Sequence, residues 1–488
     1  MKKDESFLVK NRKLDKFYFR QLREKTLITN DGGNWISLPN DDFRRFISGK
    51  IKNTEKLYQE LEKKGFINVG KKKLSELASQ YLKLNYSLSQ GPSLFIIVLT
   101  LRCNHRCLYC QVIPENPKQK GFDMGKATAK KTVDLIFRTP SESVRLEFQG
   151  GEPLLNWPVL KYVVKYAKEV NKKKKKNLKI SIVSNLSLMD DEKLKFLLDE
   201  EVDIACSLDG PAKVHDKNRT YLDGASSHKV VSVKIKKIQK EIKKKQEKTK
   251  EKTDKLNAIL TVTKFSLPYY KEIIDEYMSY GLDNVFIRPL SPFGLERKTT
   301  DLIGYTAEEF LEFYKKSLDY IVELNLKGKL FAERGTFNIL RKILKQEDPN
   351  FLELRSPCGA GIGQMAFDYD GKIFTCDEGR MARRMSHDNF MIGEVDDNDY
   401  NRLIDNEVVK TMCLASSLDN HAGCQDCVYK PYCGVCPLAN YIECGTIFPQ
   451  LANTLRCRIN KGIFDYIFRK MGDKKYRTVF ESWVGKGL

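Results

Sequence analysis

The sequence lacks any long hydrophobic run. No stretch approaches the ~18 consecutive apolar residues that a membrane span requires. The basic first residues, "MKKDESFLVK", are not followed by the apolar segment of a secretory signal. We therefore expect a cytoplasmic protein that does not insert into a membrane. In a reducing compartment, the 13 cysteines of the chain predict metal or redox chemistry rather than disulfides.

Aromatic residues are missing from the two lysine tracts. "NKKKKKN" at 171–177 and "KIKKIQKEIKKKQEKTKEKTDK" at 234–255 supply much of the formal net charge of +21. Proteins that bind single-stranded nucleic acids stack the bases on aromatic side chains. The tracts therefore predict solvated surface, the second as a long helix with interleaved glutamates, and we do not expect nucleic-acid binding. An acidic protein or peptide partner is the alternative.

Residues 1–88 predict a small N-terminal module. "KTLIT" and "NWISL" are strand patterns joined by the turn "NDGG". Two helix patterns follow. The first has Asn40 or Asp41 as its N-cap and ends at Gly49, and the second ends at Gly65. A hairpin with short helices is typical of a winged-helix-like module, and a purely structural cap is the alternative.

Residues 89–300 predict an α/β core. Six strand patterns alternate with amphipathic helix patterns; the strands are "SLFIIVLT", "SVRLEFQ", "LKISIVSN", "VDIACSLDG", "LNAILTVT" and "NVFIRPLS". Near-continuous apolar strands indicate a parallel sheet. We expect a partial (β/α)6 TIM-like barrel, with a doubly wound sheet as the alternative. A helical bridge over 301–350 and a cysteine-rich domain over 351–488 complete the predicted organisation.

Polar residues cluster where these strands end. The positions, in chain order, are Cys103, Cys107 and Cys110, then Gly150, Gly151 and Glu152, then Ser184 and Asn185, then Ser207 and Asp209, and finally Arg219. Each group taken alone is typical of a turn. The carboxyl ends of parallel strands meet at one edge of a sheet, where barrel enzymes keep their working residues. The sequence therefore predicts one site there.

The first of these groups supplies three thiols. A structural zinc site normally has four ligands, so a lone triplet suits zinc poorly and leaves one position open on another kind of centre. The spacing Cys103-x3-Cys107-x2-Cys110 resembles the signature of the radical S-adenosylmethionine enzymes. That resemblance implies a 4Fe–4S cluster on the three thiolates, with S-adenosylmethionine chelating the open iron. Reductive cleavage of S-adenosylmethionine would then give a 5′-deoxyadenosyl radical that abstracts hydrogen from a substrate.

The same resemblance assigns roles to the other residues at the strand ends. It implies that Tyr109 lies against the adenine and that Gly151 and Glu152 meet the methionine amine. Ser184, Ser207 and Asp209 would lie around the ribose, and Arg219 would meet the carboxylate. Gly150 and Asn185 complete the predicted cofactor-binding residues.

Nine of the thirteen cysteines lie beyond residue 351. Paired CxxC units taken alone fit zinc as well as iron–sulfur sites. After a radical S-adenosylmethionine core, the pattern resembles the SPASM extension, which carries two auxiliary 4Fe–4S clusters. This chain has two residues between Cys433 and Cys436, where that family usually has three. The resemblance implies one cluster on Cys358, Cys376 and Cys436, with Cys413, Cys444 or an open position as the fourth ligand. It implies the other on Cys424, Cys427, Cys433 and Cys457.

The whole chain most resembles the SPASM-type maturase of the His-Xaa-Ser peptide system. The segments that carry this resemblance are "LITNDGGNWISL", "VLTLRCNHRCLYCQV", "EFQGGEPLLN", "SNLSL", "FIRPLSPFG" and "GAGIGQMAFDYDGKIF". It implies modification of a ribosomally made peptide or protein, with the leader bound as an added strand on the N-terminal module. A flavodoxin or ferredoxin electron donor and a companion maturase would be its partners.

Asp377 is the predicted substrate-side proton acceptor, because it follows Cys376 directly, as a catalytic Asp does in the resembling sulfatase maturases. The alternatives are a turn residue or a partner for Arg380, and Glu378 is a second candidate. The sequence does not specify the bond that is made. Formylglycine formation on Ser or Cys is the alternative activity, and a zinc-bearing, basic nucleic-acid-binding protein is the alternative from another class.

Overall fold

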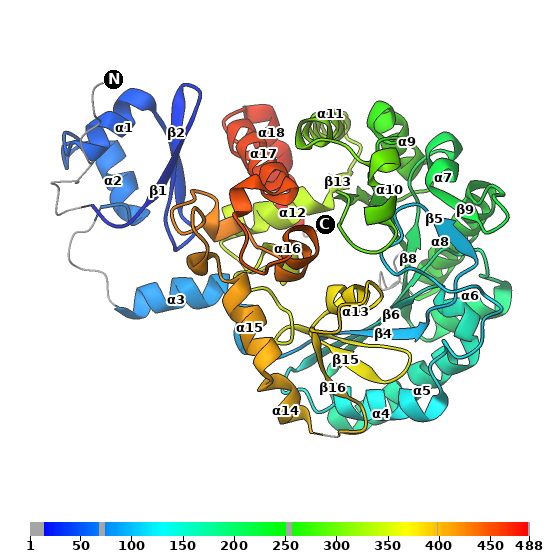
Figure 1. The fold of residues 1–488 in the computed structure, drawn as a ribbon. Coiled ribbons are helices and arrows are strands. Elements are labelled where there is room, and N and C mark those ends of the chain that lie inside the picture. The colour runs from blue at the N-terminus through cyan, green and yellow to red at the C-terminus, as the bar shows by residue number, and fades with distance from the viewer. Residues whose placement is uncertain (1–13, 68–73, 250–255, 398, 487–488) are drawn as a thin grey trace.

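The computed structural model describes residues 14–67, 74–249, 256–397 and 399–486. Figure 1 shows a small N-terminal module standing beside a larger body, in which helices surround a long sheet. The end of the second lysine tract, residues 250–255, lies outside the described residues.

The body is built on a nine-stranded sheet with the order β12-β10-β8-β7-β6-β4-β14-β15-β16. Its first six strands run parallel and follow the predicted sequence order from β4 outward. They are β4 (Leu94–Thr100), β6 (Ser143–Gly150), β7 (Asn177–Ser184), β8 (Val202–Ser207), β10 (Leu256–Thr261) and β12 (Ile287–Arg288). In β4, six of the seven residues are buried, which explains its unbroken apolar sequence.

Helices cover the outer face of this sheet (Figure 1). They are α4 (Lys126–Ile136), α5 (Trp157–Lys174), α6 (Asp191–Asp199), α8 (His228–Thr249) and α9 (Tyr270–Ser279). Each buries one apolar face in the main core. Asp190 begins α6 as an N-cap, because its carboxylate accepts the Lys193 N–H at 2.8 Å. These helices alternate with the strands as the sequence predicts.

The sixth predicted strand is divided in two, so the expectation of one continuous strand is wrong. Its first half, β11 (Asn284–Val285), leaves the main sheet and pairs with β13 (Ala332–Glu333). Only β12 pairs with β10. The buried Glu333 carboxylate accepts the Ile287 N–H at 3.1 Å where the chain changes partners. This contact lies 46 residues away in sequence, so no local pattern marks it.

The sheet continues past the boundary expected at residue 350. β14 (Gln364–Phe367) pairs parallel with β4, and β15 (Lys372–Phe374) and β16 (Met391–Glu394) follow antiparallel. The cysteine-rich segment therefore contributes three strands to the core sheet. Because β12 and β16 form its two ends, the sheet stays open.

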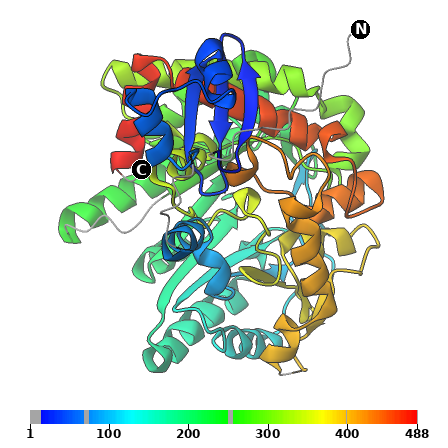
Figure 2. The same ribbon diagram turned by 90° about the vertical axis from the view of Figure 1, so that its left-hand side faces the viewer.

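The N-terminal module is a three-stranded antiparallel sheet with helices on one face (Figure 2). Its elements are β1 (Tyr18–Leu22), β2 (Lys25–Thr29), β3 (Trp35–Pro39), α1 (Asn40–Ile47) and α2 (Lys56–Lys63). The predicted hairpin is β2 and β3, and β1 was missed. Pro39, not Asn40 or Asp41, is the N-cap of α1. Gly49 and Gly65 follow the two helices with positive φ, as predicted.

The other face of this small sheet packs on the body. Thr29 donates its hydroxyl to the Val428 carbonyl at 2.7 Å, and Tyr432 donates its hydroxyl to the Gly33 carbonyl at 3.1 Å. The Trp35 ring meets Phe468 edge-on. The module therefore packs directly against the cysteine-rich segment.

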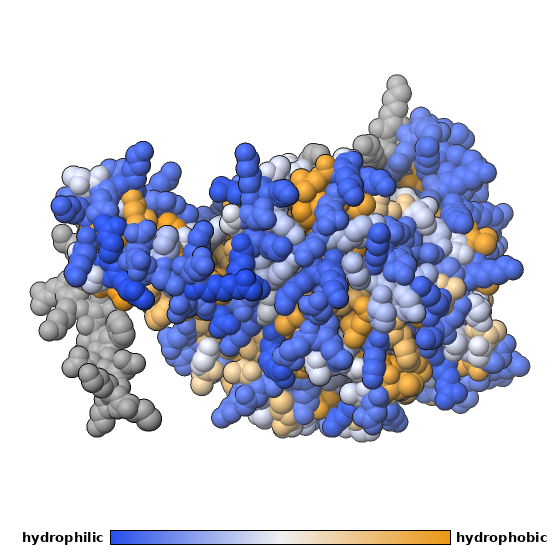
Figure 3. All heavy atoms as spheres, turned by 90° about the horizontal axis from the view of Figure 1, so that it is seen from above, coloured by the Kyte–Doolittle hydropathy of each residue, from blue (hydrophilic) through white to orange (hydrophobic). Residues whose placement is uncertain are grey.

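Helices complete the body. They include α10 (Glu296–Ile303), α11 (Ala307–Leu326), α12 (Arg334–Leu340), α13 (Asp377–Arg383), α15 (Glu407–Ser416), α16 (Pro437–Cys444), α17 (Leu455–Lys470) and α18 (Lys474–Lys486). The side that carries α11, α17 and α18 is largely hydrophilic, with scattered hydrophobic patches (Figure 3). Within the described ranges, none of the helices combines the length and the apolar character needed to cross a bilayer. His421, three residues before Cys424, is buried, and its Nε2 lies 2.8 Å from the Ala415 carbonyl oxygen.

Candidate active site

The three-cysteine loop follows β4 directly and is fixed by two backbone contacts. Cys103 donates its N–H to the Glu115 carbonyl at 2.9 Å. The middle of the loop forms β5 (His105–Cys107), which pairs antiparallel with β9 (Arg219–Tyr221). This pairing brings Arg219 beside the loop, although 112 residues separate Arg219 from the middle cysteine.

The three thiols fit a metal centre. Burial raises the pKa of each thiol, that of Cys107 to about 12, and nearby thiols of the set raise the pKa of Cys103 and Cys107 further. Such a thiol ionises when a cationic metal replaces its proton. The loop therefore offers three clustered sulfur ligands and no fourth.

Two glycines allow the next strand end to approach this loop. Gly150 has a φ of +126°, and a Cβ there would lie 2.3 Å from the Thr100 carbonyl oxygen. A Cβ on Gly151 would lie 2.1 Å from the Arg102 carbonyl oxygen. Only glycine fits at either position, so the turn is pressed against the residues that lead into the first cysteine.

Glu152 joins the ends of β6 and β7. Its buried carboxylate accepts the Ser184 hydroxyl at 2.8 Å, the Asn185 N–H at 2.8 Å and the Leu154 N–H at 3.1 Å. Burial nevertheless raises its pKa to about 7, because these donors do not fully replace water. A bound cation such as an ammonium group would stabilise the ionised form.

Asn185 connects this pair of strand ends to the cysteine loop. Its amide nitrogen donates to the Asn104 side-chain oxygen at 3.0 Å and lies 3.9 Å from the Cys103 sulfur. Ser207 is buried at the end of β8. The ends of β6 and β7 thus meet beside the thiols.

Asp209, Tyr109 and Arg219 form a buried network at the fourth strand end. The Tyr109 hydroxyl donates to an Asp209 carboxylate oxygen at 2.5 Å, and Arg219 donates to the same oxygen at 3.3 Å. The guanidinium also lies 5.0 Å from the centre of the Tyr109 ring and 3.8 Å from the Cys107 sulfur. Arg219 therefore links the strand end to the cysteine loop.

His215 and Ser227, which sequence reasoning missed, support that network from behind. The Asp209 N–H donates to His215 Nδ1 at 3.3 Å, and His215 Nε2 lies 3.0 Å from the Ser227 hydroxyl. That hydroxyl donates to the Arg219 carbonyl at 2.5 Å. Burial holds the pKa of His215 well below its usual value, so the ring is neutral. No spacing in the sequence marks either residue.

A cavity of about 130 Å³ lies between the sheet and the cysteine-rich segment. One wall is the loop after β12, residues 289–293, which belongs to the quoted "RPLSPFG" segment. Gln111, next to the third cysteine of the loop, lies at one side, and Glu378 and Cys436 lie at another. The cavity thus reaches from the three-cysteine loop to the cysteine-rich segment.

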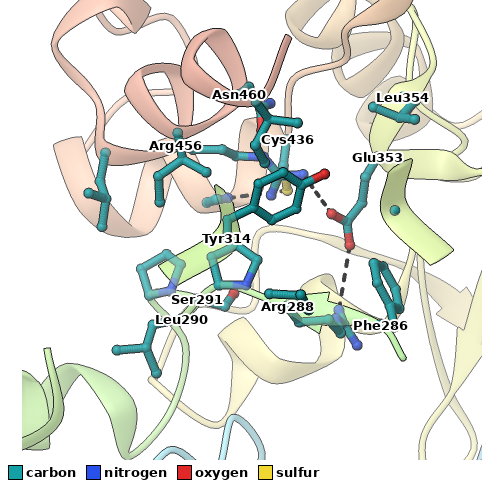
Figure 4. A pocket seen from close by; sticks show the side chains of 18 of the residues that line it. Phe286, Arg288, Leu290, Ser291, Tyr314, Glu353, Leu354, Cys436, Arg456 and Asn460 are labelled. Carbon is teal, nitrogen blue, oxygen red and sulfur yellow. Dashed lines mark hydrogen bonds and ion pairs between the residues drawn. The ribbon is translucent and has the colours of Figure 1, made fainter. Parts of the chain in front are cut away.

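An ion-pair network forms part of the cavity wall (Figure 4). One carboxylate oxygen of Glu353 lies 3.4 Å from Arg288 Nη2, and the other lies 3.2 Å from Arg456 Nη2. Both arginines are therefore already paired. Sequence reasoning missed all three residues, because they come from segments more than 60 residues apart and carry no motif.

Asp377 and Glu378 face different surroundings. Asp377 accepts two hydrogen bonds from the fully buried Arg380, at 2.9 and 2.5 Å. Glu378 lines the cavity, and burial raises the pKa of its carboxyl group. The contact with Arg380 is the structural alternative stated for Asp377 from the sequence.

The C-terminal cysteines lie in two groups. Burial raises the pKa of Cys358, Cys376 and Cys436, and the carboxylate of Glu378 raises all three further. The Cys358 thiol also raises the pKa of Cys376 and of Cys436, and the Cys436 thiol raises that of Cys376. Cys413 interacts with this set only through Cys358. Cys444 is exposed at the end of α16.

The second set lines one small cavity. The four thiols are those of Cys424, Cys427, Cys433 and Cys457. Burial raises the pKa of Cys433 to about 12, and the other three thiols act in the same direction. Cys206 lies apart from both sets, in the main core.

Within the described part of the chain, no three His, Cys, Asp or Glu side chains are arranged to hold a single metal ion. Thiolates around a 4Fe–4S cluster stand further apart than ligands of one ion, because iron and sulfide atoms lie between them.

Comparison with known proteins agrees with this geometry. Residues 97–224 match the Radical SAM superfamily. The cysteine-type anaerobic sulfatase-maturating enzyme of Clostridium novyi is 24% identical over 346 residues, which cover 70% of this chain and 86% of that protein.

Two solved structures share the fold. Native anSMEcpe with bound AdoMet and Cp18Cys peptide aligns with a TM-score of 0.65 and 19% identity, covering 79% of this chain and all of that one. Streptococcus suis SuiB bound to the precursor peptide SuiA aligns with a TM-score of 0.52 and 13% identity, covering 90% and 98%. The chain thus contains a radical S-adenosylmethionine domain over residues 97–224 and a SPASM-like cysteine-rich C-terminal region; it is similar in sequence to an anaerobic sulfatase-maturating enzyme and shares the fold of SuiB.

Proposed function

We propose that this enzyme modifies a ribosomally synthesised peptide or protein, beginning with hydrogen abstraction by a 5′-deoxyadenosyl radical. The observation that carries the proposal is the single cavity that touches both Gln111, beside the three-cysteine loop, and Cys436 of the first C-terminal set. A substrate side chain held there would be close to both centres. The peptides bound to the two related structures support a peptide substrate.

The residues at the strand ends would hold S-adenosylmethionine. In this proposal Glu152 meets the methionine amine, which would stabilise its buried carboxylate in the ionised form. Tyr109 lies against the adenine, Ser184, Asn185, Ser207 and Asp209 surround the ribose, and Arg219 meets the carboxylate. The existing contacts of Glu152 and Asp209 would fix their orientation before the ligand arrives. Cys103, Cys107 and Cys110 would hold a 4Fe–4S cluster, which would supply the electron for cleavage.

Two further 4Fe–4S clusters are proposed on the C-terminal sets. The interaction of the Cys413 thiol with Cys358 favours Cys413 over the exposed Cys444 as fourth ligand of the first cluster. An open position there is the alternative. Asp377 remains the sequence-based candidate for the proton acceptor. Glu378 is the competing candidate, and its position on the cavity wall supports this role.

The N-terminal module is proposed to bind the leader of the substrate by main-chain pairing at a sheet edge. In the described residues no strand pairs with the outer edge of β1 or of β3. Leader peptides N-methylated at alternate residues on the paired side should bind more weakly than the unmodified leader. Methylation on the opposite side should have little effect. Equal effects would point to side-chain recognition instead.

More specifically, we propose that the substrate is a His-Xaa-Ser precursor peptide. A flavodoxin or ferredoxin would donate the electrons, and a companion maturase would be a further partner. Formylglycine formation on Ser or Cys is a second candidate, supported by the similarity to a cysteine-type sulfatase-maturating enzyme. The deciding experiment offers the reconstituted enzyme both substrates and analyses the products by mass spectrometry. Oxidation of a sulfatase peptide with no change in a His-Xaa-Ser precursor would select the second candidate.

A further inference from the structure

Two buried cations beside the C-terminal cysteines lack a carboxylate partner. Arg355 and Lys342 are 4% and 6% exposed, and across residues 14–67, 74–249, 256–397 and 399–486 neither forms an ion pair. Arg355 donates from Nη1 to the Asn350 side-chain oxygen at 3.2 Å, while Nε and Nη2 have no partner. Lys342 donates to the Leu354 carbonyl at 2.5 Å.

Such an arrangement needs an explanation, since buried charges in proteins are normally paired. Asp348 is the carboxylate that acts on both cations. Its two oxygens, however, accept the backbone N–H groups of Ser87 and Asn350, at 3.0 and 2.8 Å. The two positive charges therefore exceed the one negative charge that Asp348 provides.

Arg355 lies against the first cysteine set. A Cβ built on Gly359 would be 3.2 Å from its Nη1, and one built on Gly363 would be 2.6 Å away, so the guanidinium packs on the loop that starts at Cys358. Burial lowers the pKa of Arg355, and the thiols of Cys358 and Cys413 act in the opposite direction. The two unpartnered nitrogens thus belong to a side chain held beside these sulfurs.

Lys342 lies on the side of the second set. It lines the same cavity as Arg355 and Cys433. Burial lowers its pKa to about 8, and Cys433 acts against that shift. Gly434 packs closely on the backbone of Arg355, because a Cβ there would lie 2.7 Å from the Arg355 carbonyl oxygen. Gly434 and Val435 separate Cys433 of one set from Cys436 of the other.

We propose that Arg355 and Lys342 are the countercharges of the two auxiliary clusters, Arg355 for the Cys358 set and Lys342 for the Cys433 set, and that each raises the reduction potential of its own cluster. The inference rests on the auxiliary clusters of the proposed function. A thiolate-bound 4Fe–4S cluster is anionic and gains a further negative charge on reduction. A buried cation therefore stabilises the reduced form most, and nearby N–H donors act in the same direction.

The test compares neutral and charge-conserving variants of the reconstituted holoenzyme. Arg355→Met and Lys342→Met are measured beside Arg355→Lys and Lys342→Arg, in redox titrations followed by electron paramagnetic resonance. Arg355→Met should shift one auxiliary cluster to a more negative potential, and Lys342→Met should shift the other. The charge-conserving variants should stay near wild type. Lys130→Met, which removes an exposed lysine of α4, is the control for net charge.

Three results would overturn the inference. The potentials could stay unshifted at full iron content, both clusters could shift equally in either variant, or the charge-conserving variants could shift as far as the Met variants. Iron content separates this failure from failure of the proposed function. About twelve iron per chain with unshifted potentials would refute only the countercharge role. About four iron per chain in the wild type would refute the auxiliary clusters as well.

Discussion

The carboxylate of Asp377 and the guanidinium of Arg380 form a buried ion pair within one turn of α13. Arg380 is completely buried, and the side chain of Asp377 is 12% exposed. Arg380 Nη1 has no hydrogen-bond partner among the described residues. On the same helix, the carboxylate of Asp377 balances the positive charge of Arg380. Asp377 therefore has a structural task whatever its part in the chemistry.

Asp377→Asn should lower the free energy of unfolding by about 3 kcal/mol, because breaking a buried pair leaves one charge uncompensated. Denaturant unfolding checks this. The catalytic expectation is separate: the variant should make 5′-deoxyadenosine but little modified peptide. Glu378→Gln is the matched variant. Product loss in Glu378→Gln with wild-type stability, together with a destabilised but active Asp377→Asn, would assign the chemistry to Glu378.

Replacing Cys103, Cys107 and Cys110 together by Ala should remove about four of about twelve iron atoms per chain and abolish cleavage of S-adenosylmethionine. Iron analysis and assay of 5′-deoxyadenosine measure both effects. Cys206→Ala, in the main core, should leave the iron content unchanged. Stoichiometric zinc without broad visible absorption in the wild type would contradict the prediction.

Glu152→Gln should weaken binding of S-adenosylmethionine at least ~10-fold. In the proposed function this carboxylate meets the methionine amine, and a neutral amide loses that charge-assisted hydrogen bond, which is worth about 1.5–3 kcal/mol. Equilibrium dialysis under anaerobic conditions gives the affinity. Glu147→Gln, earlier on the same strand, is the control. Unchanged affinity in Glu152→Gln would remove this carboxylate from the binding site.

Glu296 should make stability depend on pH. Burial raises its pKa to about 9, and one carboxylate oxygen has no partner. The native state therefore holds this proton more strongly than the unfolded state, so stability falls as pH rises from about 4.5 towards 9. Glu296→Gln should exceed wild type by on the order of 4 kcal/mol at pH 8 and match it near pH 4.5.

Denaturant unfolding across this pH range provides the measurement. Glu312→Gln, an exposed change on α11, should follow the wild-type curve. Parallel curves for Glu296→Gln and wild type would show that the carboxyl group titrates alike in the folded and unfolded states.

Deletion of residues 1–88 should weaken leader binding and also lower the unfolding temperature. The deletion removes the Gly33 carbonyl that accepts from Tyr432 and the Trp35 ring that packs on Phe468. Leader titration and thermal unfolding measure the two effects. A truncated enzyme with unchanged unfolding temperature would mean that the module is not part of the folded body.

The sequence alone predicted the chemistry of the site and determined most of its scaffold. Three cysteines after an apolar strand, nine more in the C-terminal region and acceptors at successive strand ends carry the resemblance to the radical S-adenosylmethionine enzymes. The parallel strands were predictable for the same reason, since an unbroken apolar segment such as Leu94–Thr100 must be buried on both faces. These signals are local in the chain.

The tertiary structure decided every feature that depends on distant partners. β11 left the main sheet for β13, β14 joined β4 across the expected boundary, and Glu353 gathered Arg288 and Arg456 from separate segments. It also distinguished Asp377, held by Arg380, from Glu378 on the cavity wall. Adjacent side chains on a helix turn point in different directions, so only packing determines which one reaches the cavity and which one pairs with a buried cation.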